Sequence, residues 1–383
     1  MNAYCVASLN QLIERARILV GKIPRSLPQD YDTLAQTCRQ KINTAVAQIQ
    51  RLLEEPRFQL EQYQSERLRS LRRIVAELDV LETVAIAALH RAHEDDHRLN
   101  AVLETIRQEI KYPLVRPVVS GLSQQYFCIH SELNLLCVPL TEGQFLLHLP
   151  DLYHELGHPL LTVDNDPVVE PFQRAYLDAL TEILAYIDSE KTKESRRRGP
   201  DHPRFLLNQW ESTWIRFWLT EFFCDLFAVF VVGPAFAWAH LHLFAKRGGD
   251  AYDFPITGVS THPADAARML ALLEALCLTG FQTEAENIET KWANLLQHAG
   301  AREEPEFVRC YPRKLMRTVA AKALEGVRGI GARVAEPSTH GVIHDSLNRA
   351  WNVFWTDPTN FTSWERKRAE EVLQTIASAR NPR

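Results

Sequence analysis

Residues 154–158 read His-Glu-Leu-Gly-His, a pattern whose residue types and spacing suit metal-assisted hydrolysis. Two histidines four positions apart lie one turn apart on the same face of a helix. Neutral imidazoles placed in this way can occupy two positions around a zinc ion. Glu155 lies beside them and can take a proton from a water molecule at the metal. We therefore interpret His154 and His158 as zinc ligands and Glu155 as a general base.

The same spacing occurs a second time, at residues 93–97, which read His-Glu-Asp-Asp-His. The inner positions of this copy are Asp95 and Asp96, and Arg91 and Arg98 flank it. Charged side chains are seldom buried unless they are paired, whereas the first copy is surrounded by leucines. We interpret the second copy as a solvated helix face without a specific metal role.

A third zinc ligand is expected in residues 221–225, which read Glu-Phe-Phe-Cys-Asp. Glu221 and Asp225 share one helix face, and their neighbours are almost all apolar, so both carboxylates need partners. We expect Glu221 to bind the metal and Asp225 to hold the second ring nitrogen of a ligand histidine. The alternative is a buried ion pair with an arginine. Cys224 is interpreted as a small buried thiol rather than a ligand.

Two further candidates, His262 and Arg268, lie at the start of another predicted helix. Pro263 suits the first helical position and Asp265 the first turn, which leaves His262 in the cap region. There it can contact an oxyanion that develops during hydrolysis, while Arg268 can pair with Asp225 or another buried acid. The alternative is a capped surface helix whose histidine has no role.

Taken in order, these blocks resemble the gluzincin metallopeptidases, and within them the HtpX and CAAX-prenyl endopeptidase family. The match rests on residues 154–158, residues 221–225 and His262-Pro263 followed by Arg268, and it covers roughly residues 130–275. The resemblance implies a zinc site and a reaction carried by a small set of residues. These are His154, His158 and Glu221 as ligands, Glu155 as base and acid, Asp225 and Arg268 in support, and His262 near the reacting carbonyl.

The chain also differs from that family. Pro159 follows His158 directly and is expected to kink or end the helix. Members of the family in membranes have transmembrane helices, and we expect none here. The most apolar stretch, Leu226 to Leu243, is broken by Gly233-Pro234 and is interpreted as a buried hairpin or kinked helix. Prenylated substrates and a membrane role therefore do not carry over.

The elements that must position these residues are mostly helices. Before residue 111, apolar residues recur at three- and four-residue spacing, as in Leu71, Ile74 and Leu78, which predicts long helices in a bundle or coiled coil. This arm is interpreted as scaffold, or as a surface for a regulatory partner or self-association. The charged segment 190–203 is predicted to be a mobile loop that can cover the site.

Between residues 112 and 149 the pattern changes to β-branched and apolar residues that predict short strands. A turn near residues 131–134 would place Cys128 opposite Cys137, and we interpret both as small apolar residues. Pro139 cannot donate a ladder hydrogen bond, which predicts that the strand near Leu135 to Leu140 lies at a sheet edge. Its free backbone groups would then bind an extended peptide.

Length, net charge and cysteine content limit the kinds of protein that this chain can be. The 383 residues suffice for two or three domains, and a net charge of −5 gives no electrostatic basis for nucleic-acid binding. The seven cysteines form no CxxC pair, and we see no signal peptide or membrane span. A reducing, cytoplasmic location is therefore expected.

The sequence predicts a mainly α (α+β) fold, in which a helical zincin-like core with a small β-sheet or hairpin is flanked by helical regions. The expected parts are an N-terminal helical arm (1–111), a metallopeptidase domain (112–299) and a C-terminal helical lobe (300–383). We expect a soluble zinc endopeptidase that acts on protein or peptide substrates and has low basal activity. The alternatives are a non-catalytic scaffold with structural zinc and a zinc hydrolase of a non-peptide substrate.

Overall fold

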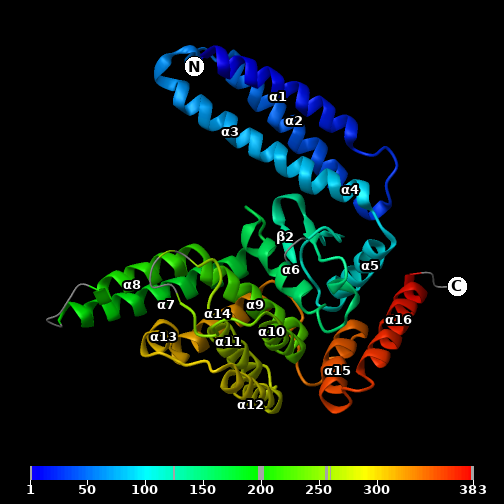
Figure 1. The fold of residues 1–383 in the computed structure, drawn as a ribbon, viewed down its shortest axis with the longest axis vertical. Coiled ribbons are helices and arrows are strands. Elements are labelled where there is room, and N and C mark those ends of the chain that lie inside the picture. The colour runs from blue at the N-terminus through cyan, green and yellow to red at the C-terminus, as the bar shows by residue number, and fades with distance from the viewer. Residues whose placement is uncertain (1, 124–125, 197–201, 255–257, 259, 381–383) are drawn as a thin grey trace. The chain divides into compact units, whose positions relative to one another are not determined.

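A computed structural model describes residues 2–123, 126–196, 202–254, 258 and 260–380 (Figure 1). Helices dominate these residues and one small sheet accompanies them, so the predicted mainly α fold is confirmed. The chain forms two compact units, one of residues 1–100 and 117–140, the other of residues 101–116 and 141–383.

These units differ from the three parts expected from the sequence. The strands belong with the N-terminal helices because Val118, Leu135 and Cys137 join the same apolar core as the helix residues. A boundary at residue 111 would therefore divide the first unit. The helices after residue 300 belong to the same unit as residues 141–299.

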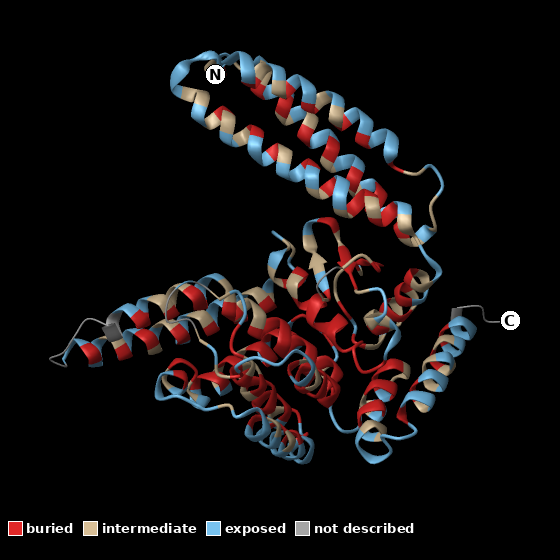
Figure 2. Ribbon diagram, in the orientation of Figure 1, coloured by how far each residue is buried: buried red, intermediate tan, exposed pale blue. Residues whose placement is uncertain are grey.

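The first unit begins with a helical bundle whose apolar stripe was predicted. Its elements are α1 (Asn2–Lys22), α2 (Asp32–Glu54), α3 (Gln64–Val80), the π-helical η4 (Leu81–Ile86) and α4 (Ala87–Arg91). Leu71, Ile74, Leu78 and Leu81 are all buried, which confirms the stripe. Figure 2 shows buried residues along the inner faces of α1, α2 and α3 and exposed residues on their outer faces.

A three-stranded sheet completes the first unit. Its strands are β1 (Val118–Ser120), β2 (Cys128–His130) and β3 (Leu135–Cys137), in the order β1-β3-β2. The predicted hairpin is confirmed, because β2 and β3 are antiparallel and place Cys128 opposite Cys137. The predicted edge position of the strand near Leu135 is wrong, since β3 also pairs with β1 in parallel. Pro139 lies beyond the last paired residue, so its missing N–H breaks no ladder bond.

Helix α5 (Glu94–Glu109) begins in the first unit and ends in the second. The remaining helices all belong to the second unit. They are α6 (Asp151–Thr162), α7 (Glu170–Ser195), α8 (His202–Thr213), the π-helical η7 (Trp214–Trp218), α9 (Leu219–Val232), α10 (Pro234–Arg247), α11 (Asp265–Leu278), α12 (Gln282–Ala299), α13 (Pro305–Cys310), α14 (Arg313–Gly329), α15 (Val342–Thr356) and α16 (Phe361–Arg380). Short 3-10 turns lie at Gln29–Tyr31, Pro56–Gln59, Glu61–Tyr63, Ser131–Leu133 and Glu142–Gln144.

Helix α9 lies at the centre of the second unit. Nearly all of its residues are buried, and α6, α11 and α14 pack against it. It ends where Gly233 adopts φ of 75°, a conformation that favours glycine, and Pro234 then begins α10. The predicted break of this apolar stretch at Gly233-Pro234 is therefore confirmed. Among the described residues, none of the helices has the length and apolar character needed to cross a membrane.

Helix α7 extends beyond its predicted end. The segment from residue 190 was predicted to be a loop, but the helix continues to Ser195. Arg309 lies 2.6 Å from a carboxylate oxygen of Glu190 and 2.9 Å from one of Glu194. This partner on α13 explains why a charged segment stays helical. Residues 197–201 of the predicted loop lie outside the described residues, and its last two residues begin α8.

Candidate metal centre

Two helices bring the residues of the first histidine motif and of the acidic block together. Helix α6 carries His154, Glu155 and His158, and α9 carries Glu221 and Asp225. Both helices lie in the second unit, and they are close neighbours in Figure 1.

The glycine of the motif allows the two helices to approach closely. A Cβ atom added at Gly157 would lie 2.7 Å from the Cα atom of Cys224 on α9. Real side chains do not tolerate this separation, so only glycine fits at this crossing. The close approach brings Glu221 and Asp225 within reach of α6.

His154 lies between two carboxylates. Its Nε2 atom is 3.5 Å from Oε2 of Glu221, and its Nδ1 atom is 2.8 Å from Oδ1 of Asp225. The His154 ring also stacks on Phe236 of α10, with the ring centres 6.1 Å apart. The rings of His154 and His158 have centres 5.1 Å apart. A histidine that binds a metal through one ring nitrogen usually has a carboxylate hydrogen-bonded to its other ring nitrogen. Asp225 has this position at Nδ1 of His154, which leaves Nε2, near Glu221, for a metal.

Asp225 joins His154 to Arg268. The Arg268 guanidinium donates two hydrogen bonds to the Asp225 carboxylate, with N–O distances of 2.6 and 2.7 Å. Asp225 is 0% exposed, so this charge is compensated entirely by protein groups. Both expected partners of Asp225, the histidine and an arginine, therefore contact it at once. Burial alone would raise the pKa of Asp225, but the Arg268 charge and these hydrogen bonds lower it well below its usual range.

The same network sets the charges of the other groups. Burial would lower the pKa of His154, but its hydrogen bonds to Asp225 and Glu221 raise it to about 10. Burial would raise the pKa of Glu221, but the bond and charge of His154 lower it to about 2. Burial and the charge of His154 lower the pKa of His158 to about 4. The carboxylates of Asp225 and Glu221 thus stabilise a positive charge on His154. A bound cation would need the same negative surroundings.

Cys224 is a further donor at this place. Its sulfur lies with ligand atoms of His154 and His158 in a group whose members are all within 4.8 Å of one another. Burial, together with the charges of Glu221 and Glu155, raises the pKa of this thiol well above its usual range. Cys224 therefore groups with both histidines, whereas Glu221 lies 3.5 Å from His154 but outside this group.

The structure places His262 at the rim of this group. His262 has a side chain that is 62% exposed, with its Nε2 atom 3.6 Å from Oε2 of Glu221. Helix α11 begins at Asp265 and not at Pro263 as predicted, so His262 precedes the helix by a few residues. Its Nδ1 atom lies 3.0 Å from the Thr261 hydroxyl.

Pro159 was expected to kink or end the helix, and it does not end α6. The helix continues to Thr162 with Pro159 inside its last turns. Proline removes the N–H that would bond the carbonyl of Glu155, but Val163 N–H still bonds the carbonyl of Pro159. The proline removes one hydrogen bond from the helix without ending it, and His154 and His158 both precede it.

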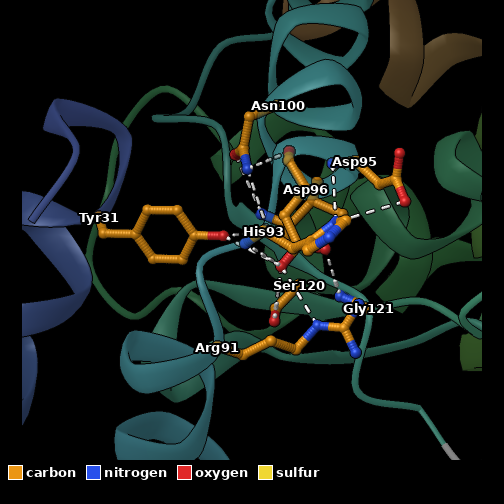
Figure 3. Close-up of polar contacts among 9 residues, drawn as sticks. Tyr31, Arg91, His93, Asp95, Asp96, Asn100, Ser120 and Gly121 are labelled. Carbon is orange, nitrogen blue, oxygen red and sulfur yellow. Dashed lines mark hydrogen bonds and ion pairs between the residues drawn. The ribbon is translucent and has the colours of Figure 1, made fainter.

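The second histidine motif lies in the first unit and is different in kind (Figure 3). His93 contacts Asp95, at 3.4 Å, and is mostly exposed, as predicted for a solvated face. Asp96, however, is only 1% exposed, so the prediction is wrong at this residue. Its carboxylate accepts a 2.9 Å hydrogen bond from the N–H of Gly121 and lies 3.5 Å from Nε of Arg91. Asp96 is buried because it ties the start of α5 to the end of β1.

One cluster of potential metal ligands was not predicted from the sequence. It lies on the β2–β3 hairpin of the first unit. Cys128 is solvent-accessible, and its ligand atom lies within 4.8 Å of those of His130 and Cys137. The hydrogen bond from Cys137 lowers the pKa of Cys128 to about 6. The alternation Cys-x-His in a strand, opposite another cysteine, was the available signal.

The chain matches no protein-family model, no curated protein and no solved structure. The likeness to gluzincin metallopeptidases consequently stays an expectation based on the residues themselves.

Proposed function

We propose that this chain is a zinc-dependent endopeptidase of gluzincin type that acts on protein or peptide substrates. The observation that carries the proposal is the position of His154, with Glu221 beyond one ring nitrogen and Asp225 bonded to the other. His158 and Glu155 lie on the same helix as His154, with Glu155 only 7% exposed.

The donor set suits zinc, with His154, His158 and Glu221 as ligands. Two imidazoles and one carboxylate form a ligand set of catalytic zinc sites, which keep a fourth position open. When bound there, zinc would polarise the scissile carbonyl and lower the pKa of the attacking water.

Glu155 has the central role among the residues of the chain. It accepts a proton from the attacking water as the oxygen bonds to the carbonyl carbon, and then delivers this proton to the leaving nitrogen as the C–N bond breaks. His262, exposed beside Glu221, donates a hydrogen bond to the oxygen that gains negative charge. Asp225 fixes the orientation of His154, and Arg268 keeps Asp225 ionised.

Cys224 supports a second candidate function, a non-catalytic protein with structural zinc. His154, His158 and Cys224 also provide three suitable donors. The two candidates predict opposite roles for two residues of α9. Substitution of Glu221 by alanine should release the metal in the peptidase, whereas Cys224→Ser should release it in the structural site.

The decisive experiment combines zinc analysis with hydrolysis of a quenched fluorescent peptide library by the full chain. The double variant His154→Ala and Glu221→Ala should lose one equivalent of zinc relative to the unaltered chain. The matched control, His93→Ala with His97→Ala, changes the second motif and should lose none. Full zinc retention by the first double variant would contradict the ligand assignment.

Glu155→Gln should keep the metal and fold but lose turnover by about 10²–10⁴-fold, because glutamine cannot accept the proton. Glu94→Gln, the same change in the second motif, should leave turnover unaltered. Equal turnover by Glu155→Gln and the unaltered chain would rule out Glu155 as the base.

A further inference from the structure

The β2–β3 hairpin of the first unit holds three metal-competent side chains at one place. Cys128 and Cys137 are directly opposite in the antiparallel pair. His130 follows Cys128 by two positions, so both side chains point to the same face of β2. One ligand atom from each residue falls within a group no wider than 4.8 Å.

The surroundings hold these side chains in position. Cys137 is buried on β3, the central strand, which is paired on both sides. The carboxylate of Glu132 lies 3.7 Å from Nδ1 of His130 and can orient the imidazole while Nε2 coordinates. The left-handed conformation of Asn134, with φ of 49°, closes the turn between the strands. The site is therefore formed by a short, locally determined segment.

We propose that Cys128, Cys137 and His130 bind a thiophilic divalent cation, with zinc as the expected ion. Two thiolates and one imidazole favour zinc over magnesium or calcium, which prefer oxygen ligands. Solvent reaches the site at Cys128, so water or an outside ligand takes the fourth position. On binding, two S–metal bonds form, and any sulfur that still carries a proton exchanges its S–H bond for the S–metal bond and releases that proton to the solvent.

This site is independent of the proposed peptidase centre, with which it shares no residue. The bound ion would cross-link β2 and β3 close to the turn that joins them. Because it binds only the folded hairpin, it would stabilise the first unit by an amount that rises with the logarithm of its free concentration above the dissociation constant. Both cysteines were expected to be small apolar residues, and the exposure of Cys128 corrects this expectation for that residue, whereas Cys137 is buried.

Cobalt substitution of the full chain tests the proposal, in the presence of a phosphine reductant that does not bind as a thiol. Thiolate ligands give bound Co²⁺ a near-ultraviolet charge-transfer band, which a site of histidine and carboxylate lacks. We expect the band in the unaltered chain and its loss in Cys128→Ser and in Cys137→Ser. Glu132→Gln should keep the band but weaken cobalt affinity by about 10–100-fold.

Two other cysteine variants are the matched controls. Cys277→Ser removes another exposed thiol, and Cys224→Ser removes the thiol of the α6–α9 centre. The band should persist in both, and also in the His154→Ala, Glu221→Ala double variant, so failure of the peptidase proposal can be recognised separately. A band that survives Cys128→Ser in a chain that also carries Cys224→Ser, so that the second thiol-bearing group cannot supply it, would overturn the site. Absence of a band in the reduced, unaltered chain would overturn it as well, because both thiols are then free to bind the ion.

Discussion

Replacement of Gly157 by alanine tests the close packing on which the candidate centre depends. The added Cβ atom would lie 2.7 Å from the Cα atom of Cys224 and 3.0 Å from its Cβ atom. Ordinary carbon contacts need about 3.5–4.0 Å. Helices α6 and α9 must therefore separate by roughly 0.8–1.3 Å, since a backbone atom cannot rotate away as a side chain can.

Two opposing terms set the change in stability. Overpacking of this kind costs about 1–3 kcal/mol, while the change from glycine to alanine inside a helix favours folding by up to about 1 kcal/mol. Gly21 on α1 is the matched control, because a Cβ atom there meets nothing within 4 Å. The difference in unfolding free energy between the two variants should thus be about 1–3 kcal/mol, with Gly157→Ala the less stable.

The separation should also affect the metal. Glu221 would move away from His154 together with α9, and a displacement near 1 Å can cost about 10²-fold in activity. Chemical denaturation gives the stabilities, and competition with a chelator gives the zinc affinities. If Gly157→Ala proved as stable as Gly21→Ala, with zinc affinity unchanged, the crossing of α6 and α9 would not be as close as described.

Two further substitutions test buried carboxylates. Asp225→Ala should destabilise by about 3–5 kcal/mol in chemical denaturation, because it leaves the Arg268 charge buried without its partner; the exposed Glu170→Ala should cost no more than about 1 kcal/mol. A small effect of Asp225→Ala would show that water reaches the site. Asp96→Asn should destabilise by about 1–3 kcal/mol, since the bond to Gly121 weakens and a buried charge pair is lost. Asp95→Asn, its neighbour on the exposed side, should stay within about 0.5 kcal/mol, and equal effects of the two would contradict the burial of Asp96.

The features that the sequence by itself determined involve residues that lie close to one another along the chain. His154 and His158 share a face because four residues make about one helical turn. The stripe through Leu71, Ile74 and Leu78 is buried for the same reason. Cys128 opposes Cys137 because a short turn sets the register of a hairpin.

Contacts between distant residues decided what the sequence left open or predicted wrongly. The partner of β3 on its second side, β1, comes from the opposite end of the strand region, so the position of Leu135 at an edge could not be judged from Pro139 alone. Helix α7 continues past residue 190 because Arg309, more than a hundred positions later, pairs with its acidic residues.

The two histidine motifs illustrate the same limit. Asp96 looked solvated because its sequence neighbours are charged, yet Gly121 and Arg91 compensate its burial. A histidine and an arginine were both expected as partners of Asp225, and the fold brings the two to it at once, from α6 and α11. A carboxylate is buried or exposed according to which donors the fold brings to it, because its desolvation must be offset by groups that lie far away in the chain.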